Sequence, residues 1–195
     1  MPSSPRIPKT EITGVSGALA KSFSRRMLGE VPDSLGVMWH HRGVLMSIGG
    51  LGRKADRWDE CDKNLKTFAH MAVAAQVGCS FCLDYGYFKA HDEKLDEAKA
   101  SEVPRWRESD VFTPLERDVM AYAEAMTRTP PTVTDEQSAR LLDELGPAAM
   151  VELTAWIGVA NLTARTNTAL GIESEGYSKV CALPLARPAA VASPA

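Results

Sequence analysis

Two helix-start signals in the second half of the chain constrain its fold more than any other feature. Thr113-Pro114-Leu115-Glu116 combines a threonine N-cap, a proline in the first turn and a glutamate three residues after the cap, which together make a capping box. Thr134-Asp135-Glu136-Gln137 forms a second capping box. Apolar residues follow both signals at spacings of three and four, so each predicts an amphipathic helix.

Apolar stripes with helical spacing extend this pattern toward the N-terminus. Helices are predicted over Val15–Leu28, from Pro32 to Ile48, over Asp56–Val77, from Cys79 to about His91, and over Asp92–Lys99. Gly146-Pro147 is expected to end the helix begun at Thr134 and to open the last one. No segment alternates with a period of two between hairpin turns. The sequence therefore predicts an all-α fold of seven or eight helices.

The glycine cluster Gly49-Gly50-Leu51-Gly52 is expected to end a helix and open a turn. A phosphate-binding loop is the alternative, but the segment lacks the lysine of that motif and a preceding strand. The expected organisation is a Pro-rich, disordered or draped segment over 1–13, one helical domain over 14–172, and an Ala/Pro-rich, mobile tail over 173–195.

Composition and charge exclude several classes of partner. The net charge of -3 gives no electrostatic argument for binding nucleic acid or an anionic membrane. No apolar run approaches the roughly 20 residues of a transmembrane helix. The basic residues near the N-terminus precede no apolar core, so a secretory signal is not expected. We therefore expect a cytoplasmic protein with no nucleic-acid or membrane partner.

Gly78-Cys79-Ser80-Phe81-Cys82 carries the clearest chemical signal of the chain. Cysteines three residues apart lie on one face of a helical turn and can close a small disulfide. Free N–H groups of a first turn favour a thiolate there. The pair is therefore predicted to be redox-active, one thiolate attacking an oxidised substrate and the other resolving the intermediate. Motif position alone favours Cys79 as the nucleophile.

Two other interpretations of the pair remain open. It could form half of a zinc site, with further ligands from Cys61, His70 and His91, although none of these has the paired spacing of a second ligand pair. Alternatively, both cysteines could be small buried core residues without chemistry. Cys61 and Cys181 are isolated and are expected to be inert thiols.

A peroxide-reducing dithiol also needs groups that move protons. His70 precedes Cys79 by nine residues, and an antiparallel helix pair could bring it close. Asp84 and Tyr85 follow Cys82 directly, whereas helical geometry places His91 on the opposite side. The candidates are therefore His70, Asp84 and Tyr85, with surface hydrogen bonding as the simpler alternative for each.

These motifs resemble the alkylhydroperoxidase D-like (AhpD-like) branch of the carboxymuconolactone decarboxylase superfamily over roughly residues 30–175. The matching segments are Ala74–Gly78 with the adjoining cysteine pair, Phe112–Arg117, Gly158–Asn161 and Asn167–Gly171. The resemblance implies an all-α fold that oligomerises as trimers or dimers and their multiples, without metal or organic cofactor. It implies that a small-molecule peroxide or disulfide is reduced, with Cys82 attacking and Cys79 resolving, and that a dithiol supplies the electrons.

The chain departs from the family pattern at its proton-relay positions. Thr67, Phe81 and Gly86 stand where the family has a glutamate, a histidine or tyrosine, and a histidine. Either His70, Asp84 and Tyr85 have taken over, or peroxidase turnover is slow, since unassisted proton transfer costs about 10²–10⁴-fold in rate.

Two rival functions follow from the same resemblance. A lyase of the carboxymuconolactone decarboxylase type would need basic groups for a carboxylated lactone, for which His40-His41-Arg42 is the compact candidate. This cluster could equally cap a helix. The second rival is a non-catalytic helical oligomer whose proton relay has been lost.

Overall fold

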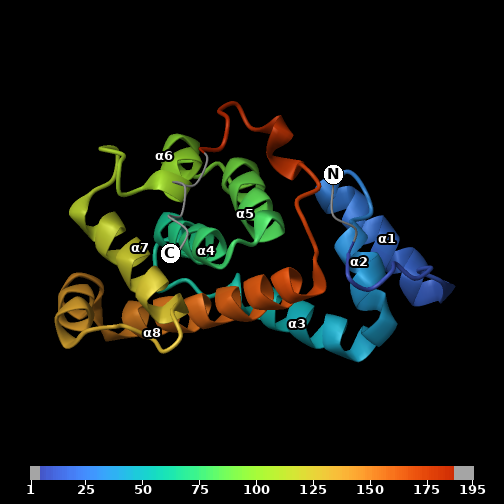
Figure 1. Ribbon diagram of the computed structural model, residues 1–195, viewed down its shortest axis with the longest axis horizontal. Coiled ribbons are helices and arrows are strands. Elements are labelled where there is room, and N and C mark those ends of the chain that lie inside the picture. Colours follow the sequence, from blue (N-terminus) through green and yellow to red (C-terminus); the bar gives the residue numbers. More distant parts are fainter. Residues whose placement is uncertain (1–4, 187–195) are drawn as a thin grey trace, which may run out of the picture.

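The computed structural model describes residues 5–186, in which helices are joined by turns and loops without a β-strand (Figure 1). This confirms the predicted all-α fold. The α-helices are α1 (Gly14–Leu28), α2 (Asp33–Met38), α3 (Arg42–Ala55), α4 (Lys63–Val77), α5 (Ser80–Asp92), α6 (Glu97–Glu102), α7 (Pro114–Thr127) and α8 (Asp135–Leu170). Short 3-10 helices cover η1 (Trp39–His41), η2 (Val103–Arg105) and η3 (Tyr177–Val180).

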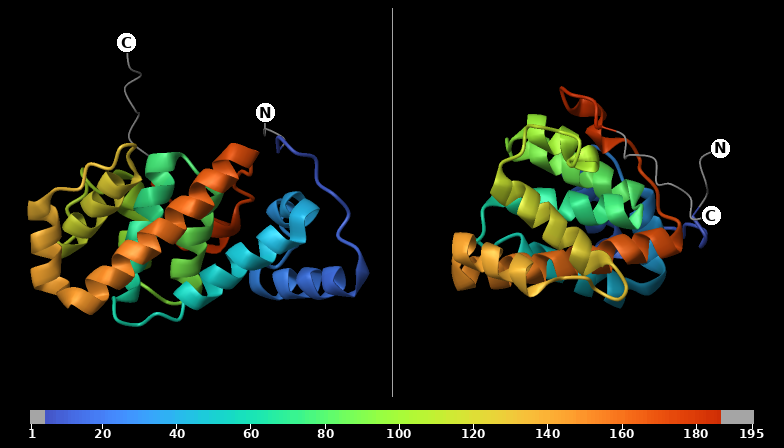
Figure 2. Two further views of the ribbon diagram at one scale, coloured as in Figure 1. Left: turned by 90° about the horizontal axis from the view of Figure 1, so that it is seen from below. Right: turned by 60° about the vertical axis from the view of Figure 1, so that its left-hand side comes forward.

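Helix α4 lies at the centre and packs against α5, α7 and α8 (Figures 1 and 2). Its Phe68, Met71 and Val73 side chains are completely buried. Met120 of α7 and Ile157 of α8 close the same core from two sides. The cysteine pair follows α4 directly, so the central, buried helix of the fold positions it.

Both predicted capping boxes form. The Thr113 side chain accepts a hydrogen bond from the Glu116 N–H, and the Thr134 side chain accepts one from the Gln137 N–H. The Glu116 and Gln137 side chains in turn accept the backbone N–H groups of Thr113 and Thr134. Gly146 has a φ of 75° and breaks the path of α8, as Gly146-Pro147 predicts.

Helix α8 is long and apolar enough to cross a membrane by length and composition. Its Leu153, Ile157, Ala160 and Ala164 side chains are instead buried against the core. The break at Gly146 interrupts the helix as well. We therefore assign α8 as a core helix.

The predicted turn at Gly49–Gly52 is wrong, because α3 runs through these glycines to Ala55. A glycine inside a helix costs about 1 kcal/mol relative to alanine but does not forbid the helix. The helix predicted from Pro32 is divided into α2, η1 and α3, because His41 begins α3 by accepting the Val44 N–H with its ring.

Two further helix starts lie later than predicted, and in both cases an aspartate N-cap decides the position. Asp62 accepts the Asn64 and Leu65 N–H groups, so α4 begins at Lys63 and 56–62 forms a loop. Asp96 accepts the Lys99 N–H, so α6 covers Glu97–Glu102 and not Asp92–Lys99.

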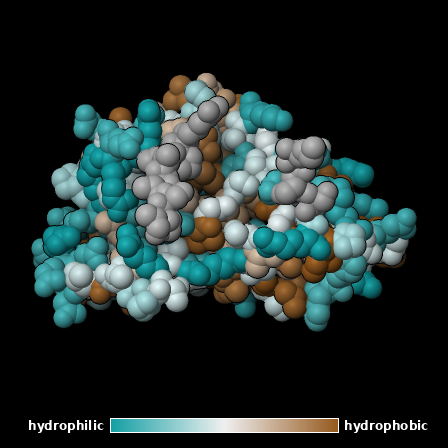
Figure 3. Space-filling view, in the orientation of Figure 1, coloured by the Kyte–Doolittle hydropathy of each residue, from teal (hydrophilic) through white to brown (hydrophobic). Residues whose placement is uncertain are grey.

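Helix α1 forms where predicted, but its apolar stripe stays exposed. Val15, Leu19 and Phe23 are 81%, 67% and 55% accessible. Within the described chain, α1 makes few contacts with other helices and lies at one edge of the molecule (Figures 1 and 2). Figure 3 shows hydrophobic atoms on the neighbouring surface over α3, where Met46 is 61% exposed.

The expectation of a mobile tail is wrong for residues 173–186, which are bound to α5. The buried Asp84 carboxylate accepts hydrogen bonds from the Ser174 hydroxyl and from the Gly176, Tyr177 and Ser178 N–H groups at 2.8–2.9 Å. Residues 187–195 lie outside the described residues.

The N-terminal segment lies against the end of α8. Arg6 donates its backbone N–H to the Leu170 carbonyl at 2.9 Å and its guanidinium to the Thr168 carbonyl at 2.8 Å. Residues 5–13 are therefore draped over the helical domain, and residues 1–4 lie outside the described chain.

Replacing Asp84 should release the C-terminal segment. In Asp84→Ala the donors of Ser174, Tyr177 and Ser178 lose their acceptor. We therefore expect the free energy of unfolding to fall by about 3 kcal/mol. Urea unfolding and protease mapping between residues 172 and 186 measure both effects. Asp92→Ala removes an exposed carboxylate from the same helix and should change neither. Equal urea stability and equal protease cleavage of Asp84→Ala and Asp92→Ala would contradict the anchoring role of Asp84.

Candidate dithiol site

A sharp junction between α4 and α5 positions the cysteine pair. Gly78 adopts a φ of 78°, which suits glycine and lets the chain leave α4 at once. Cys79 then occupies the N-cap of α5, and its Sγ accepts the Cys82 N–H at 3.2 Å. The Cα atoms of the two cysteines lie 5.3 Å apart, within the range of a disulfide.

Cys82 and Cys79 differ in their relation to the cavity that lies beside α5 in the described chain. Both cysteines are nearly inaccessible, with exposed fractions of 2% and 3%, but Cys82 lines a cavity of about 340 Å³ and Cys79 does not. The apolar wall consists of Phe23, Ile48, Phe81, Trp156, Val159 and Ala160. The cavity therefore favours Cys82 as the reacting sulfur, whereas motif position alone favours Cys79.

Asn167 contacts the reacting sulfur from α8. Its side-chain amide donates to the Cys82 Sγ at 3.4 Å. A donor at this position stabilises a thiolate more than a thiol. The sequence places Asn167 in the closing helix but gives no signal that its amide meets a cysteine 85 residues away.

His70 lies beside Cys82, as the predicted helix pair suggests. Its Nε2 is 3.3 Å from the Cys82 carbonyl oxygen, and because a carbonyl only accepts, Nε2 carries the proton. Burial lowers the pKa of His70 to about 4, although the bond to Cys82 opposes this shift. The imidazole is therefore neutral at pH 7.

Gly86 explains why this imidazole fits. A β-carbon at Gly86 would lie 3.1 Å from His70 Cδ2 and 3.0 Å from Met71 Cγ. The His70 ring thus occupies the space that a side chain at position 86 would need. A histidine at position 86 would therefore compete with His70 for the same space.

Tyr85 also lines the cavity, where its ring stacks on Phe81 at 6.3 Å and an interplanar angle of 8°. Burial raises the pKa of Tyr85, so its hydroxyl keeps its proton at neutral pH. Thr67 lines the same cavity and contributes no charge.

Asp84 is the predicted candidate that the structure does not bring to the cavity. Burial would raise the pKa of Asp84, but hydrogen bonds from Ser178, Tyr177 and Ser174 outweigh it and hold the pKa below its ordinary value. Its carboxylate anchors the C-terminal segment. The structure therefore brings together Cys79, Cys82, His70 and Tyr85, without Asp84.

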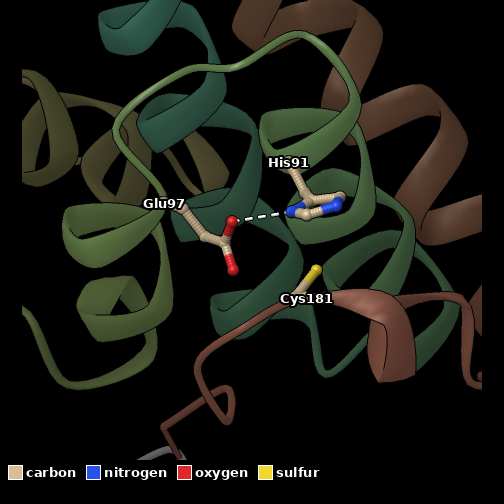
Figure 4. Close-up of side chains that lie close together, drawn as sticks. All are labelled: His91, Glu97 and Cys181. Atoms are coloured by element: carbon tan, nitrogen blue, oxygen red, sulfur yellow. Dashed lines mark hydrogen bonds and ion pairs between the residues drawn. The ribbon is translucent and has the colours of Figure 1, made fainter.

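Within residues 5–186, the two cysteines belong to no cluster of three possible metal ligands, although His70 lies beside Cys82. Burial raises the pKa of Cys61 to about 11. His91 lies with Glu97 and Cys181, with ligand atoms within 4.8 Å of one another (Figure 4). The Glu97 carboxylate already accepts from His91 Nδ1 at 2.7 Å and from the Ala182 N–H at 2.6 Å. This cluster fastens the C-terminal segment to α5 and α6.

Charged groups that the sequence analysis did not single out surround the rest of the cavity. Lys66 and Glu152 form a buried ion pair at 2.7 Å. Lys89 pairs with Asp56 at 2.5 Å. The ammonium groups of Lys66 and Lys89 lie 5.5 and 5.8 Å from the ring centre of Trp156. Cations and an aromatic face thus meet in the wall of the cavity.

The basic cluster proposed for a lyase lies elsewhere. His40 Nε2 is 2.9 Å from the Pro8 carbonyl, His41 caps α3, and Arg42 stacks over Trp39. Cavity-lining residues do not include these three. The lyase hypothesis therefore loses the residues on which it depends.

Fold and site together define a class of helical proteins that present a cysteine pair at a helix start to a small cavity. Residues 51–125 match the carboxymuconolactone decarboxylase family. The chain is 36% identical over 137 residues to the uncharacterized protein YnjA of Escherichia coli (strain K12), covering 70% of this chain and 74% of that protein. The protein belongs to the carboxymuconolactone decarboxylase family.

Solved structures share the fold. A peroxidase-related protein from Ralstonia eutropha JMP134 with an alkylhydroperoxidase AhpD core has a TM-score of 0.78 at 13% identity, covering 92% of this chain and 97% of that one. A cysteine-to-alanine variant of the debrominase Bmp8, in complex with 2,3,4-tribromopyrrole, has a TM-score of 0.75 at 20% identity, covering 89% and 95%.

The buried His70 predicts a pH-dependent stability. Its pKa is about 4 when folded and 6.5 in the reference state, so only the unfolded chain binds the proton between these values. The free energy of unfolding should fall as pH drops through this window. Between pH 7 and 5 we expect wild type to lose about 2 kcal/mol more than His70→Gln, by urea denaturation. Parallel pH profiles would contradict this.

Proposed function

We propose that the protein is a cofactor-free dithiol oxidoreductase that reduces hydroperoxides. The observation that carries the proposal is that Cys82, within reach of Cys79, lines a cavity large enough for a small organic substrate. The fold shared with the alkylhydroperoxidase AhpD core supports the same chemistry.

The reaction consumes one hydroperoxide and one dithiol. The Cys82 thiolate attacks the terminal oxygen of ROOH, the O–O bond breaks, and the departing alkoxide takes a proton to give ROH. Cys82 is then a sulfenic acid. The Cys79 thiol attacks it, water leaves, and the disulfide forms. An external dithiol reduces this disulfide by exchange and is itself oxidised.

Each neighbouring group has a role in this cycle. The Asn167 amide stabilises the Cys82 thiolate before attack. The Cys82 N–H stabilises Cys79 as the leaving thiolate when a donor attacks Cys82 from the cavity. The Tyr85 hydroxyl, protonated at neutral pH, is the proton donor for the alkoxide. His70 positions the Cys82 backbone through its carbonyl.

Reductive debromination is a second candidate, favoured by the aromatic side chains of Phe81, Tyr85 and Trp156 around the cavity. A Cys82 thiolate would take bromine from an aromatic carbon, which gains a proton. Cys79 would then displace bromide to form the disulfide. The structural neighbour named as a debrominase motivates the inclusion of 2,3,4-tribromopyrrole among the substrates tested.

The nucleophile is tested by trapping the first intermediate. In Cys79→Ser, hydroperoxide should convert Cys82 to a sulfenic acid that dimedone labels and mass spectrometry locates, because no resolving thiol remains. In Cys82→Ser the label should be lost, and both variants should lose at least 100-fold in steady-state peroxide turnover. Cys181→Ser is the matched control. Labelling of Cys79 in Cys82→Ser, without labelling in Cys79→Ser, would reverse the roles.

We also propose that the chain is cytoplasmic and works as a homo-oligomer in which α1 packs against a second copy. A 15-residue helix is marginal in water without a packing partner. The exposed Val15 and Leu19 give α1 an apolar face that nothing in residues 5–186 covers. A second copy presents the same face and can cover it symmetrically.

Assembly is tested by placing a charge on this face. Leu19→Asp should shift the molar mass measured by light scattering toward the monomer, because a carboxylate would be buried in the interface. Ala18→Asp adds the same charge to an exposed position beside the stripe and should leave the mass unchanged. A monomeric wild type would refute the proposal.

A further inference from the structure

The cavity beside Cys82 is lined by two chemically different sets of side chains. Phe81, Trp156 and Ala160 belong to its apolar wall. Charged side chains line it as well, and these are Arg53, Asp56, Lys63, Lys66, Lys89 and Glu93. A substrate that fills the cavity therefore meets both apolar surface and ionic groups.

The cations outnumber the anions, and Arg53 accounts for the excess. Glu152 neutralises Lys66 at 2.7 Å. Asp56 and Glu93 lie 2.5 and 3.4 Å from Lys89, and Lys63 is 3.9 Å from Glu93. Within residues 5–186, the Arg53 guanidinium has neither an ion pair nor a hydrogen bond to another residue, although it lines the cavity.

Glycines of α3 lie next to this guanidinium. Gly49 and Gly52 line the cavity with Arg53. The two guanidinium nitrogens lie 3.7 and 4.0 Å from where β-carbons of Gly49 and Gly50 would stand, which is ordinary van der Waals contact. The last turns of α3 therefore bring Arg53 to the wall of the cavity that Cys82 also lines.

We propose that the cavity recognises acidic amphiphiles: substrates with an apolar body whose carboxylate binds Arg53 while the hydroperoxide group reaches Cys82. This rests on the proposed function and names its substrate class. An unpaired guanidinium binds a carboxylate through two parallel hydrogen bonds. Thr67 adds no negative charge that would repel such a ligand.

Binding is tested without turnover. Oxidised wild-type protein is titrated with decanoate and with methyl decanoate, which differ in charge, by isothermal calorimetry at low salt. We expect decanoate to bind about 10-fold tighter, and this advantage to vanish in Arg53→Gln. Arg57→Gln removes an exposed arginine that does not line the cavity and should keep the advantage. Equal affinities in wild type, or an advantage that survives Arg53→Gln, would overturn the proposal.

Kinetics separate this proposal from the proposed function. For the hydroperoxide of linoleic acid, Arg53→Gln should raise KM about 10-fold and leave kcat unchanged. For cumene hydroperoxide, which lacks a carboxylate, neither constant should move. If the protein reduces cumene hydroperoxide and shows no preference for the hydroperoxide of linoleic acid, the proposed substrate class is refuted and the peroxidase function is not. Arg53-dependent decanoate binding in a protein that reduces no hydroperoxide would refute the peroxidase function alone.

Discussion

The structure depends on one tight junction, where the chain passes from α4 to α5 over the two residues Gly78 and Cys79. Because α4 is packed on three sides, its end is fixed in space. The first turn of α5 therefore starts at a defined place, and its free N–H of Cys82 meets the Cys79 sulfur. Chemical asymmetry between the two cysteines follows from this geometry: one sulfur caps the helix, while the other faces the cavity.

A close contact between neighbouring helices shapes the surroundings of Cys82. A β-carbon at Gly86 of α5 would lie 3.1 Å from the His70 ring of α4, so the ring packs directly against the glycine. The imidazole lies beside Cys82, where it is neutral and hydrogen-bonded to a carbonyl. In the cycle that we propose, proton movement therefore depends on Tyr85 and on the thiols themselves.

Signals that act within a few residues could be read from the sequence. The boxes at Thr113 and Thr134, the break at Gly146 and the cysteine spacing all belong to this class, and the structure contains each of them. Long-range contacts could not be predicted. The Asn167 amide meets Cys82 across 85 residues, and the 173–186 segment is bound by a carboxylate that the sequence suggested for catalysis. The glycines of α3 misled the prediction because a helix can run through glycines at a modest cost in free energy.

The hydrogen bonds between Asp84 and the C-terminal segment bear on where the chain can be truncated. The family match ends at residue 125, and the last long helix ends at Leu170. A chain that ends at Leu170 would keep all the long helices. The buried Asp84 carboxylate, two residues from Cys82, would nevertheless lose the donors of the C-terminal segment. Ser80, between the cysteines, would also lose the Ser174 N–H that donates to its hydroxyl. A short C-terminal sequence beyond a recognised domain can therefore help to hold the dithiol site in place.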